Sequence, residues 1–415
     1  MLVRRAVGAV VSVAWLTFSN PGHAAEPVFS PSGPDAAAYG APEYRVGTFA
    51  NANRQAEMVG NYSHYDALRA SRVVRRPVTV APLRRDGPEA AISYSYRGAS
   101  HTMLDYLDRH PATAMVLVKN GVILFEHYQY GRTDRDRMVS QSMAKTVTAL
   151  LVGIAVSEGR IRSIDDTAET YAPRLHGTLH GGTPIRALLT MSSGVAFRET
   201  YGDPTADNSR FGRALFARDS AGPEAAFAML TERAAAPGTR FNYAGADTEA
   251  LGVVLRAVTG VPQAEYLQSR LWQPMGAEAD AAWVLDGAGQ EPGFCCMTAV
   301  ARDWVRLGLL MANDGAANGR QIVPAAWIRE MTTPAAPYLA PGQATKFDGY
   351  GFQTWLLAGP RRMFAFRGIH GQAVLVDPAS KLVLVHTAVR VAATGDPNAG
   401  ELAALWRAAV EQLGR

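Results

Sequence analysis

The chain has 415 residues, of which 48% are hydrophobic and 19% are charged, and its formal net charge is +4. This composition is typical of a folded globular protein and excludes a disordered or fibrous chain. No basic stripe, aromatic RNA-binding run or block of Lys and Arg occurs, so we expect no nucleic-acid partner. The length exceeds that of a usual single core, which predicts two lobes or one large core with an embedded helical part.

Residues 1–25 have the pattern of an export signal. Arg4 and Arg5 precede an apolar stretch of 13 residues, Ala6–Phe18, and small residues follow at Gly22-His23-Ala24. As a helix this stretch would span about 20 Å, which is less than the roughly 30 Å hydrocarbon core of a bilayer and disfavours an uncleaved anchor. We therefore expect cleavage after residue 24 or 25 and an exported, bacterial, periplasmic protein without stable membrane insertion.

The two cysteines of the chain, Cys295 and Cys296, are neighbours in the sequence. A bond between adjacent cysteines requires a geometry that few chains adopt. An oxidising compartment would favour disulfides, but the geometric difficulty leads us to expect two buried thiols and no structural disulfide.

The first predicted elements are an N-terminal arm, a β-hairpin and the start of a helix. Residues 26–95 are rich in Pro, Gly, Ala and Arg with weak periodicity, and we interpret them as an extended N-terminal arm. In Ala112–Tyr130, two apolar runs flank Asn120-Gly121, a strong hairpin signal. A helix is then predicted to begin near Ser142, because apolar residues recur at helical spacing from Val147 onward.

The rest of the chain divides into a helical part, roughly 160–340, and a late group of strands. The predicted helices are Pro184–Met191, Ala246–Val258, Gln263–Leu271, Thr298–Asn313 and Pro324–Met331. The predicted strands are Gly351–Leu357, Met363–Arg367, Gln372–Val376 and Leu382–Val389, and a helix over Asn398–Leu413 closes the chain.

This order predicts an α+β fold, an α/β/α sandwich. One antiparallel sheet would be built from N- and C-terminal segments and flanked by helices, with an inserted helical lobe, all within a domain spanning 96–415. Ligands bind most often in a cleft between such lobes.

A short motif, Ser142-Met143-Ala144-Lys145, stands at the predicted helix start. At positions i and i+3, Ser142 and Lys145 would lie on one helical face, close enough to hydrogen-bond. A serine hydroxyl becomes a good nucleophile when an adjacent base removes its proton. An amine can be that base only if burial or neighbouring cations lower its pKa. Only four lysines occur in the chain, so chance matches to the motif are few, but the tetrapeptide alone remains a weak signal.

With its surroundings, the motif resembles the first motif of the serine β-lactamase and penicillin-binding-protein superfamily. The segments that carry this resemblance, in order, are Val139–Thr146, Leu188–Gly194, Phe241-Asn242-Tyr243 and Gly368–Gln372. Asp280–Trp283 and Thr298–Gly308 look most like the branch that contains the 6-aminohexanoate-dimer hydrolases and related esterases. The resemblance spans roughly residues 95–410 and implies the serine β-lactamase-like fold.

The resemblance also implies a set of site residues. Ser142 would be the nucleophile and Lys145 the general base, and Tyr243 would relay a proton to the leaving group. The backbone N–H groups of Ser142 and Ile369 would form the oxyanion hole. Substrate contacts would come from Tyr201, His370 and Gly371. Packing roles stay open as alternatives for Tyr201, His370 and Tyr243.

Two departures from the family pattern bear on specificity. Tyr243-Ala244-Gly245 lacks the Asn that many relatives carry, and His370-Gly371-Gln372 stands where β-lactamases carry Lys-Thr-Gly. A mostly neutral imidazole would hold a carboxylate weakly. We therefore expect poor penicillin hydrolysis and a preference for neutral esters or linear amides. An acid that would bind a substrate's amino end is not identifiable; Asp207 is a candidate, but a solvated loop carboxylate fits it better.

Other catalytic constellations do not fit the chain. We find no Gly-x-Ser-x-Gly elbow, no zinc ligand set and no phosphate-binding loop, and we expect no metal and no cofactor. The sequence thus predicts a serine hydrolase that cleaves a small ester or amide through an acyl-enzyme. Two alternatives remain: a class C-like β-lactamase or D,D-peptidase, and a non-catalytic cell-wall sensor that binds muropeptides.

Overall fold

The computed structural model describes residues 26–414, so the expected signal segment at 1–25 lies outside the described residues. A nine-stranded sheet forms its centre, with the strands in the order β1-β7-β6-β17-β16-β15-β14-β13 and β3 also paired with β7. The bounds are β1 Val28–Phe29, β3 Arg84–Arg85, β6 Ala112–Lys119, β7 Val122–Tyr128, β13 Gly349–Tyr350, β14 Trp355–Leu357, β15 Met363–Gly368, β16 Gln372–Asp377 and β17 Leu382–Ala388.

The sheet confirms the predicted union of the two ends of the domain. The early hairpin β6–β7 pairs with the late strand β17, where Val116 lies opposite Val385. These pairings and those of the late strands are antiparallel, whereas β1 and β3 pair with β7 in parallel. The predicted late strand Gly351–Leu357 is shorter in the structure and corresponds to β14.

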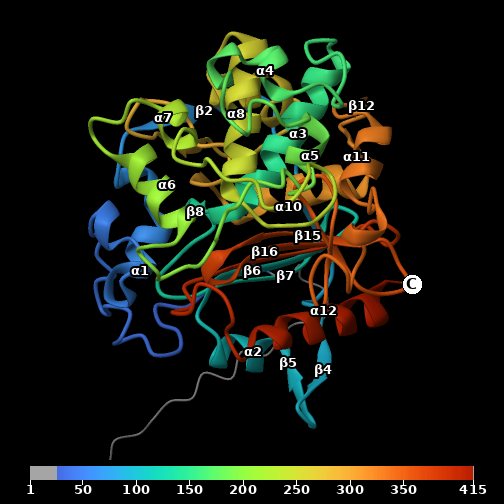
Figure 1. Cartoon of the computed structure of the whole chain (residues 1–415). Coiled ribbons are helices and arrows are strands. Elements are labelled where there is room, and N and C mark those ends of the chain that lie inside the picture. Colours follow the sequence, from blue (N-terminus) through green and yellow to red (C-terminus); the bar gives the residue numbers. More distant parts are fainter. Residues whose placement is uncertain (1–25, 415) are drawn as a thin grey trace, which may run out of the picture.

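Helices cover both faces of this sheet (Figure 1). On β17, Val383 and Val385 face a core shared with α10, while Leu382 and Leu384 face a second core shared with α12, as the two-residue period of a strand requires. Gly308 of α10 makes the first contact close, since a Cβ there would lie 2.6 Å from Val383. The helices concerned are α2 Met103–Arg109, α10 Ala301–Ala312 and α12 Ala399–Leu413.

The helical lobe lies beyond α10 and surrounds the long, almost fully buried helix α3 (Figure 1). Its helices are α3 Ala144–Ser157, α4 Ala168–Tyr171, α5 Ile185–Leu189, α6 Asp207–Phe216, α7 Pro223–Phe227, α8 Gly245–Thr259, α9 Gln263–Leu267 and α11 Ala325–Met331. The predicted helix Thr298–Asn313 begins later than expected, because Met297–Ala299 forms a strand instead. In the part of the chain that the structure describes, no helix combines the length and apolarity needed to cross a bilayer.

Several smaller elements complete the fold. A four-stranded sheet runs β2-β9-β10-β8, and two hairpins, β4–β5 and β11–β12, stand apart from it. The bounds are β2 Ser71–Val74, β4 Ser93–Tyr96, β5 Ala99–Thr102, β8 Met138–Val139, β9 Ala281–Val284, β10 Met297–Ala299, β11 Ala316–Ala317 and β12 Arg320–Gln321.

The N-terminal segment 26–95, expected to be extended, also contains the helix α1 Gln55–Ser63. The helix packs so closely on the preceding loop that a Cβ at Gly60 would lie 2.2 Å from the Arg45 carbonyl oxygen. The sequence does not reveal this helix, because its apolar residues are not confined to one face. The loop covers one side of the helix and the rest of the domain covers another. Elsewhere the segment contributes β1 and β3 to the large sheet and β2 to the small one.

Candidate active site

A tight turn presents Ser142 at the junction of the sheet and the lobe. The chain leaves β8, makes a single 3₁₀ turn over Gln141–Met143 and enters α3. Gln141 has a φ of +45°, in the left-handed region that non-glycine residues rarely adopt, so the surroundings must hold the turn. The end of β15 contributes by close approach, since a Cβ at Gly368 would lie 2.5 Å from the Ser140 carbonyl oxygen. Ser142 itself stays partly exposed.

Lys145 lies one helical turn further and is 2% exposed. Its Nζ is 2.8 Å from Ser142 Oγ and 3.2 Å from the Phe294 carbonyl oxygen. Burial lowers the pKa of Lys145 to about 8, and the nearby Glu199 carboxylate opposes that shift. The structure therefore places a buried amine, a substantial fraction of it neutral near pH 8, against the serine hydroxyl.

Tyr243 faces the same hydroxyl from the start of α8. Its ring stacks on Trp355 at 5.4 Å between centroids, and Lys145 Nζ lies 4.9 Å from the ring centre. Burial raises the pKa of Tyr243, the Glu199 carboxylate raises it further, and a hydrogen bond with Ser142 acts in the opposite direction. The phenol is therefore neutral at pH 7 and can donate a proton.

Tyr201 and Glu199 complete the lobe side of the site. The Tyr201 hydroxyl donates to Glu199, and burial, followed by the Glu199 charge, raises the pKa of Tyr201. Glu199 Oε2 also accepts the backbone N–H of Gly245 at 2.6 Å. Sequence analysis missed Glu199 as a site residue, although it stands two positions before Tyr201.

The opposite side of the site is the end of β15 and the turn after it. Ile369 and Gly371 line the same cavity as Ser142, but His370 does not. With a φ of +61°, His370 directs its ring away from the cavity, so that Nδ1 lies 2.7 Å from the Arg390 carbonyl oxygen and the ring meets Tyr62 edge-on. Burial lowers the pKa of His370. The structure thus brings Ile369 and Gly371 to the site and leaves the His370 side chain out of it.

Asp207, the candidate for binding a substrate's amino end, is also outside the cavity lining. Its carboxylate accepts the backbone N–H of Arg198 at 2.8 Å and lies 3.5 Å from Arg210, in the first turn of α6. Two acids do line the cavity: Glu199, beside Tyr201, and Asp396, which is paired with Arg390.

The cavity itself has a volume of about 770 Å³ and extends well beyond Ser142. Phe197, Glu199, Tyr201 and Tyr243 form its lobe side. From Ile369 it continues between the sheet and α12 as a trough lined by Trp355, Leu357, Leu375, Leu402, Ala403 and Trp406. Three arginines also line it, and each is paired with a carboxylate: Arg198 with Asp203, Arg367 with Asp348, and Arg390 with Asp396.

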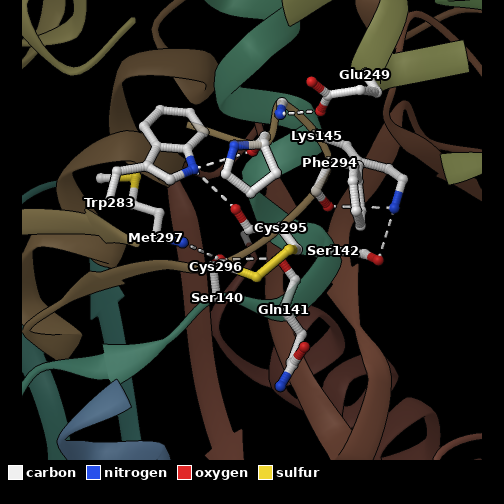
Figure 2. The surroundings of a disulfide bond; sticks show 12 residues. Ser140, Gln141, Ser142, Lys145, Glu249, Trp283, Phe294, Cys295, Cys296 and Met297 are labelled. Atoms are coloured by element: carbon white, nitrogen blue, oxygen red, sulfur yellow. Dashed lines mark hydrogen bonds between the residues drawn. A yellow bond between two sulfur atoms is a disulfide. The ribbon is translucent and has the colours of Figure 1, made fainter. Parts of the chain in front are cut away.

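The expectation of two free thiols is wrong, because Cys295 and Cys296 form a disulfide. Figure 2 shows this bond beside Ser140 and Gln141, next to the Ser142–Lys145 pair. The backbone accommodates the bond because Cys296 adopts a φ of +75°, a conformation that adjacency in the sequence does not reveal. No cluster of three or more potential metal-ligating side chains occurs within residues 26–414.

Comparison with known proteins gives a consistent set of relatives. The family model described as Beta-lactamase matches residues 101–413. The 6-aminohexanoate-dimer hydrolase of Paenarthrobacter ureafaciens is 28% identical over 286 residues, which cover 66% of this chain and 71% of that protein.

Two solved structures extend the comparison to the fold. One, provisionally described as a 6-aminohexanoate-dimer hydrolase from Bacillus anthracis, is 25% identical with a TM-score of 0.76, covering 88% of this chain and 97% of its own. The other, a penicillin-binding protein from Bacillus halodurans, is 18% identical with a TM-score of 0.56, covering 72% and 96%, and shares the fold.

Proposed function

This chain belongs to the beta-lactamase family, whose model matches residues 101–413, and from that premise we propose that it is a Ser-x-x-Lys serine hydrolase that cleaves neutral esters or linear amides. The observation that carries the proposal is the buried Lys145 amine, 2.8 Å from the partly exposed Ser142 hydroxyl. Burial lowers the pKa of this amine to about 8, which suits a base that works near neutral pH.

Acylation would proceed through the groups that meet at Ser142. Neutral Lys145 accepts the hydroxyl proton while Oγ attacks the substrate carbonyl carbon. The backbone N–H groups of Ser142 and Ile369 hold the negative oxygen of the tetrahedral intermediate; such donors contribute about 3 kcal/mol each. Tyr243 gives its proton to the departing alcohol or amine and regains one from the Lys145 ammonium.

Deacylation would use the same groups in reverse. Water takes the place of the leaving group. As its oxygen attacks the acyl carbon, water gives a proton to the Tyr243 oxygen while Tyr243 passes its own proton to the neutral Lys145 amine. The second tetrahedral intermediate collapses, the acid product leaves, and Ser142 Oγ recovers its proton from Lys145. Tyr243 can serve both steps because its pKa is raised, so its proton stays on the oxygen until a stronger base forms beside it.

The cavity supports an uncharged substrate with an apolar arm. Each arginine that lines it is already paired with a carboxylate, and the His370 ring is buried outside it. A β-lactam carboxylate would therefore meet no unpaired cation among the residues described. The trough between the sheet and α12 offers apolar surface to an acyl chain or an alkyl alcohol instead.

The named relatives add linear amides to the range of candidate substrates. Both the Paenarthrobacter ureafaciens protein and the Bacillus anthracis structure are described as 6-aminohexanoate-dimer hydrolases. Glu199 lies in the cavity where a carboxylate could meet an amine, although it is already engaged by Tyr201 and Gly245. We rank esters ahead of amino-terminated amides for that reason.

The test combines a covalent probe with three substrates. Intact-mass measurement after treatment with a fluorophosphonate should show one adduct on Ser142, and p-nitrophenyl esters should turn over faster than benzylpenicillin. A stable penicilloyl adduct with no ester turnover would favour the D,D-peptidase alternative, and rapid penicillin turnover would favour the β-lactamase. No adduct with either probe would favour the muropeptide sensor and overturn the proposal.

We also propose that the protein is exported to the periplasm after loss of residues 1–24 or 1–25. The pattern of the first 25 residues motivates this, and the Cys295–Cys296 disulfide supports it, since such bonds persist in oxidising compartments. N-terminal sequencing of protein from the periplasmic fraction of the expressing bacterium should begin near Ala25 or Glu26; a start at Met1 in the cytosol would contradict it.

A further inference from the structure

The segment Pro292–Met297 lies against the turn Ser140–Ser142, called here the catalytic turn, and hydrogen bonds hold it at every residue. Each of its six backbone carbonyls accepts a hydrogen bond. The donors, in order, are Trp283 Nε1 to Pro292, Thr148 Oγ1 to Gly293, Lys145 Nζ to Phe294, Trp283 Nε1 to Cys295, the Val284 N–H to Cys296 and the Ser140 N–H to Met297. A loop held so completely has little freedom to shift without losing several bonds.

Two of these contacts join the segment to the catalytic turn, one on each side of the disulfide (Figure 2). Before it, Phe294 offers its carbonyl to Lys145 Nζ at 3.2 Å. After it, Met297 accepts the Ser140 N–H at 2.7 Å and donates its own N–H to Ser140 Oγ at 3.1 Å. The disulfide therefore lies between Phe294, which bonds Lys145, and the strand pair β8–β10 that leads to Ser142.

The backbone conformation at the disulfide is one that residues with a Cβ rarely adopt. Cys296 has a φ of +75°, which is unfavourable for a side chain with a Cβ. Cys295 and Cys296 are only 7% and 3% exposed, beneath a tyrosine cluster to which the N-terminal segment contributes Tyr39, Tyr44, Tyr62 and Tyr65. If Cys296 relaxes once the covalent link is lost, the neighbouring carbonyls must shift with it and their hydrogen bonds must weaken.

We propose that the Cys295–Cys296 disulfide is a positioning element that holds the Phe294 carbonyl on Lys145 and so aims the amine at Ser142. The inference rests on the proposed function, because it assigns a role relative to the Lys145 base. A neutral amine carries two N–H donors and one lone pair. When one N–H is held by the Phe294 carbonyl, the lone pair can remain directed at Ser142 Oγ, 2.8 Å away.

The stability of the fold depends little on the same bond. A link between adjacent residues closes the shortest possible loop, so it removes little entropy from the unfolded chain. Loss of the bond should therefore change catalysis more than it changes Tm, which separates positioning from a merely structural role.

The test compares the wild type with the double variant C295A/C296A. We expect kcat for p-nitrophenyl acetate to fall about tenfold with KM little changed, an effect of misplacing a catalytic group. The titratable groups that face Lys145 are Glu199 and Tyr243, and both remain in the variant. Looser packing admits water to the amine and so raises the pKa of Lys145 toward its usual value. The midpoint of the acid limb of the kcat/KM profile should therefore shift to higher pH by about 0.5–1 unit.

Reduction of the wild type gives an independent measurement. Dithiothreitol transfers two electrons and two protons to the disulfide, giving two thiols and its own cyclic disulfide. The reduced wild type should then show the kcat and pH limb of C295A/C296A, and reoxidation should restore both. The double variant is the matched control, because the reductant should leave its activity unchanged.

A third variant perturbs the segment with the disulfide intact. Trp283→Phe removes the indole N–H that donates to both Pro292 and Cys295, and it should lower kcat in the same direction by a smaller factor. If C295A/C296A folds and keeps the wild-type kcat and pH limb, the inference is wrong. If the wild type itself neither hydrolyses esters nor labels at Ser142, the proposed function fails instead, and the two failures are distinguishable.

Discussion

The two sides of the cavity differ in chemistry. The lobe side presents Glu199, Tyr201 and Tyr243 to Ser142, and each of these polar groups is bonded to another group of the site. The trough between the sheet and α12 presents Leu402, Trp406 and other apolar side chains to the same space. Under the proposed function this difference would separate two tasks: the lobe side would transfer protons, and the trough would contribute binding energy. Changes on the lobe side should therefore alter kcat, and changes in the trough should alter KM.

Among variants that keep Ser142 and Lys145, the largest effect should come from the proton relay on the lobe side. Tyr243→Phe removes the hydroxyl that we propose protonates the leaving group but keeps the ring that stacks on Trp355. We expect kcat for an alkyl ester such as ethyl acetate, whose alkoxide needs a proton to leave, to fall about 100-fold, the range of a lost general acid, with KM within a factor of about two. Steady-state kinetics at pH 8 measures this. A kcat within threefold of the wild type would show that Tyr243 only packs against Trp355.

A smaller effect should come from filling the trough. Ala403→Phe places a ring into the cavity and should displace about two methylenes of a long acyl chain, each worth about 0.8 kcal/mol. KM for p-nitrophenyl octanoate should then rise about tenfold, while kinetics with p-nitrophenyl acetate should stay unchanged.

Ala404→Phe is the matched control for the trough. Ala404 is the next residue on α12 and lines a separate cavity beside the β4–β5 hairpin. It should leave KM for both esters unchanged. Equal effects of the two variants on both substrates would mean that the trough binds no part of the substrate.

The smallest effect concerns the charge beside the base. Under the proposed function, the acid limb of the kcat/KM profile reports the loss of a proton from Lys145. Burial lowers the pKa of Lys145 to about 8, so activity should rise with pH through that value. Glu199 opposes this lowering, and Glu199→Gln removes its charge but keeps an oxygen for the Gly245 N–H. The midpoint of the acid limb should therefore shift to lower pH by about half a unit. This shift is opposite in sign to that expected for C295A/C296A, and a pH profile that moves up or stays in place would contradict it.

Sequence alone could predict the parts of the site that depend on local spacing. Ser142 and Lys145 are one helical turn apart, so a helix that begins there must bring them together. The fold followed from similar local signals and from the family resemblance, because apolar runs flank Asn120-Gly121 in the hairpin β6–β7 and the late strands are short apolar runs. Neither inference needed a contact between distant segments.

The remaining parts depend on backbone groups and on conformation. The second hydrogen-bond acceptor of Lys145 is the Phe294 carbonyl oxygen, 149 residues further along the chain. Every residue has a backbone carbonyl, so the sequence cannot indicate which one Lys145 contacts. The prediction of free thiols was wrong because the sequence shows only that the two cysteines are adjacent. It does not show that Cys296 adopts a left-handed conformation, in which the disulfide forms. A left-handed His370 likewise turns its ring from the cavity, although its place in the motif suggested a substrate contact.

The role of Lys145 as the base can be tested by the rate of covalent labelling at Ser142. Lys145→Met keeps a long apolar stem in the buried site but has no lone pair on nitrogen. We expect fluorophosphonate labelling, followed by intact mass, to slow by at least about 1,000-fold, with Tm lowered by no more than a few degrees. Labelling of the folded variant at the wild-type rate would contradict the assignment of Lys145 as the group that activates Ser142.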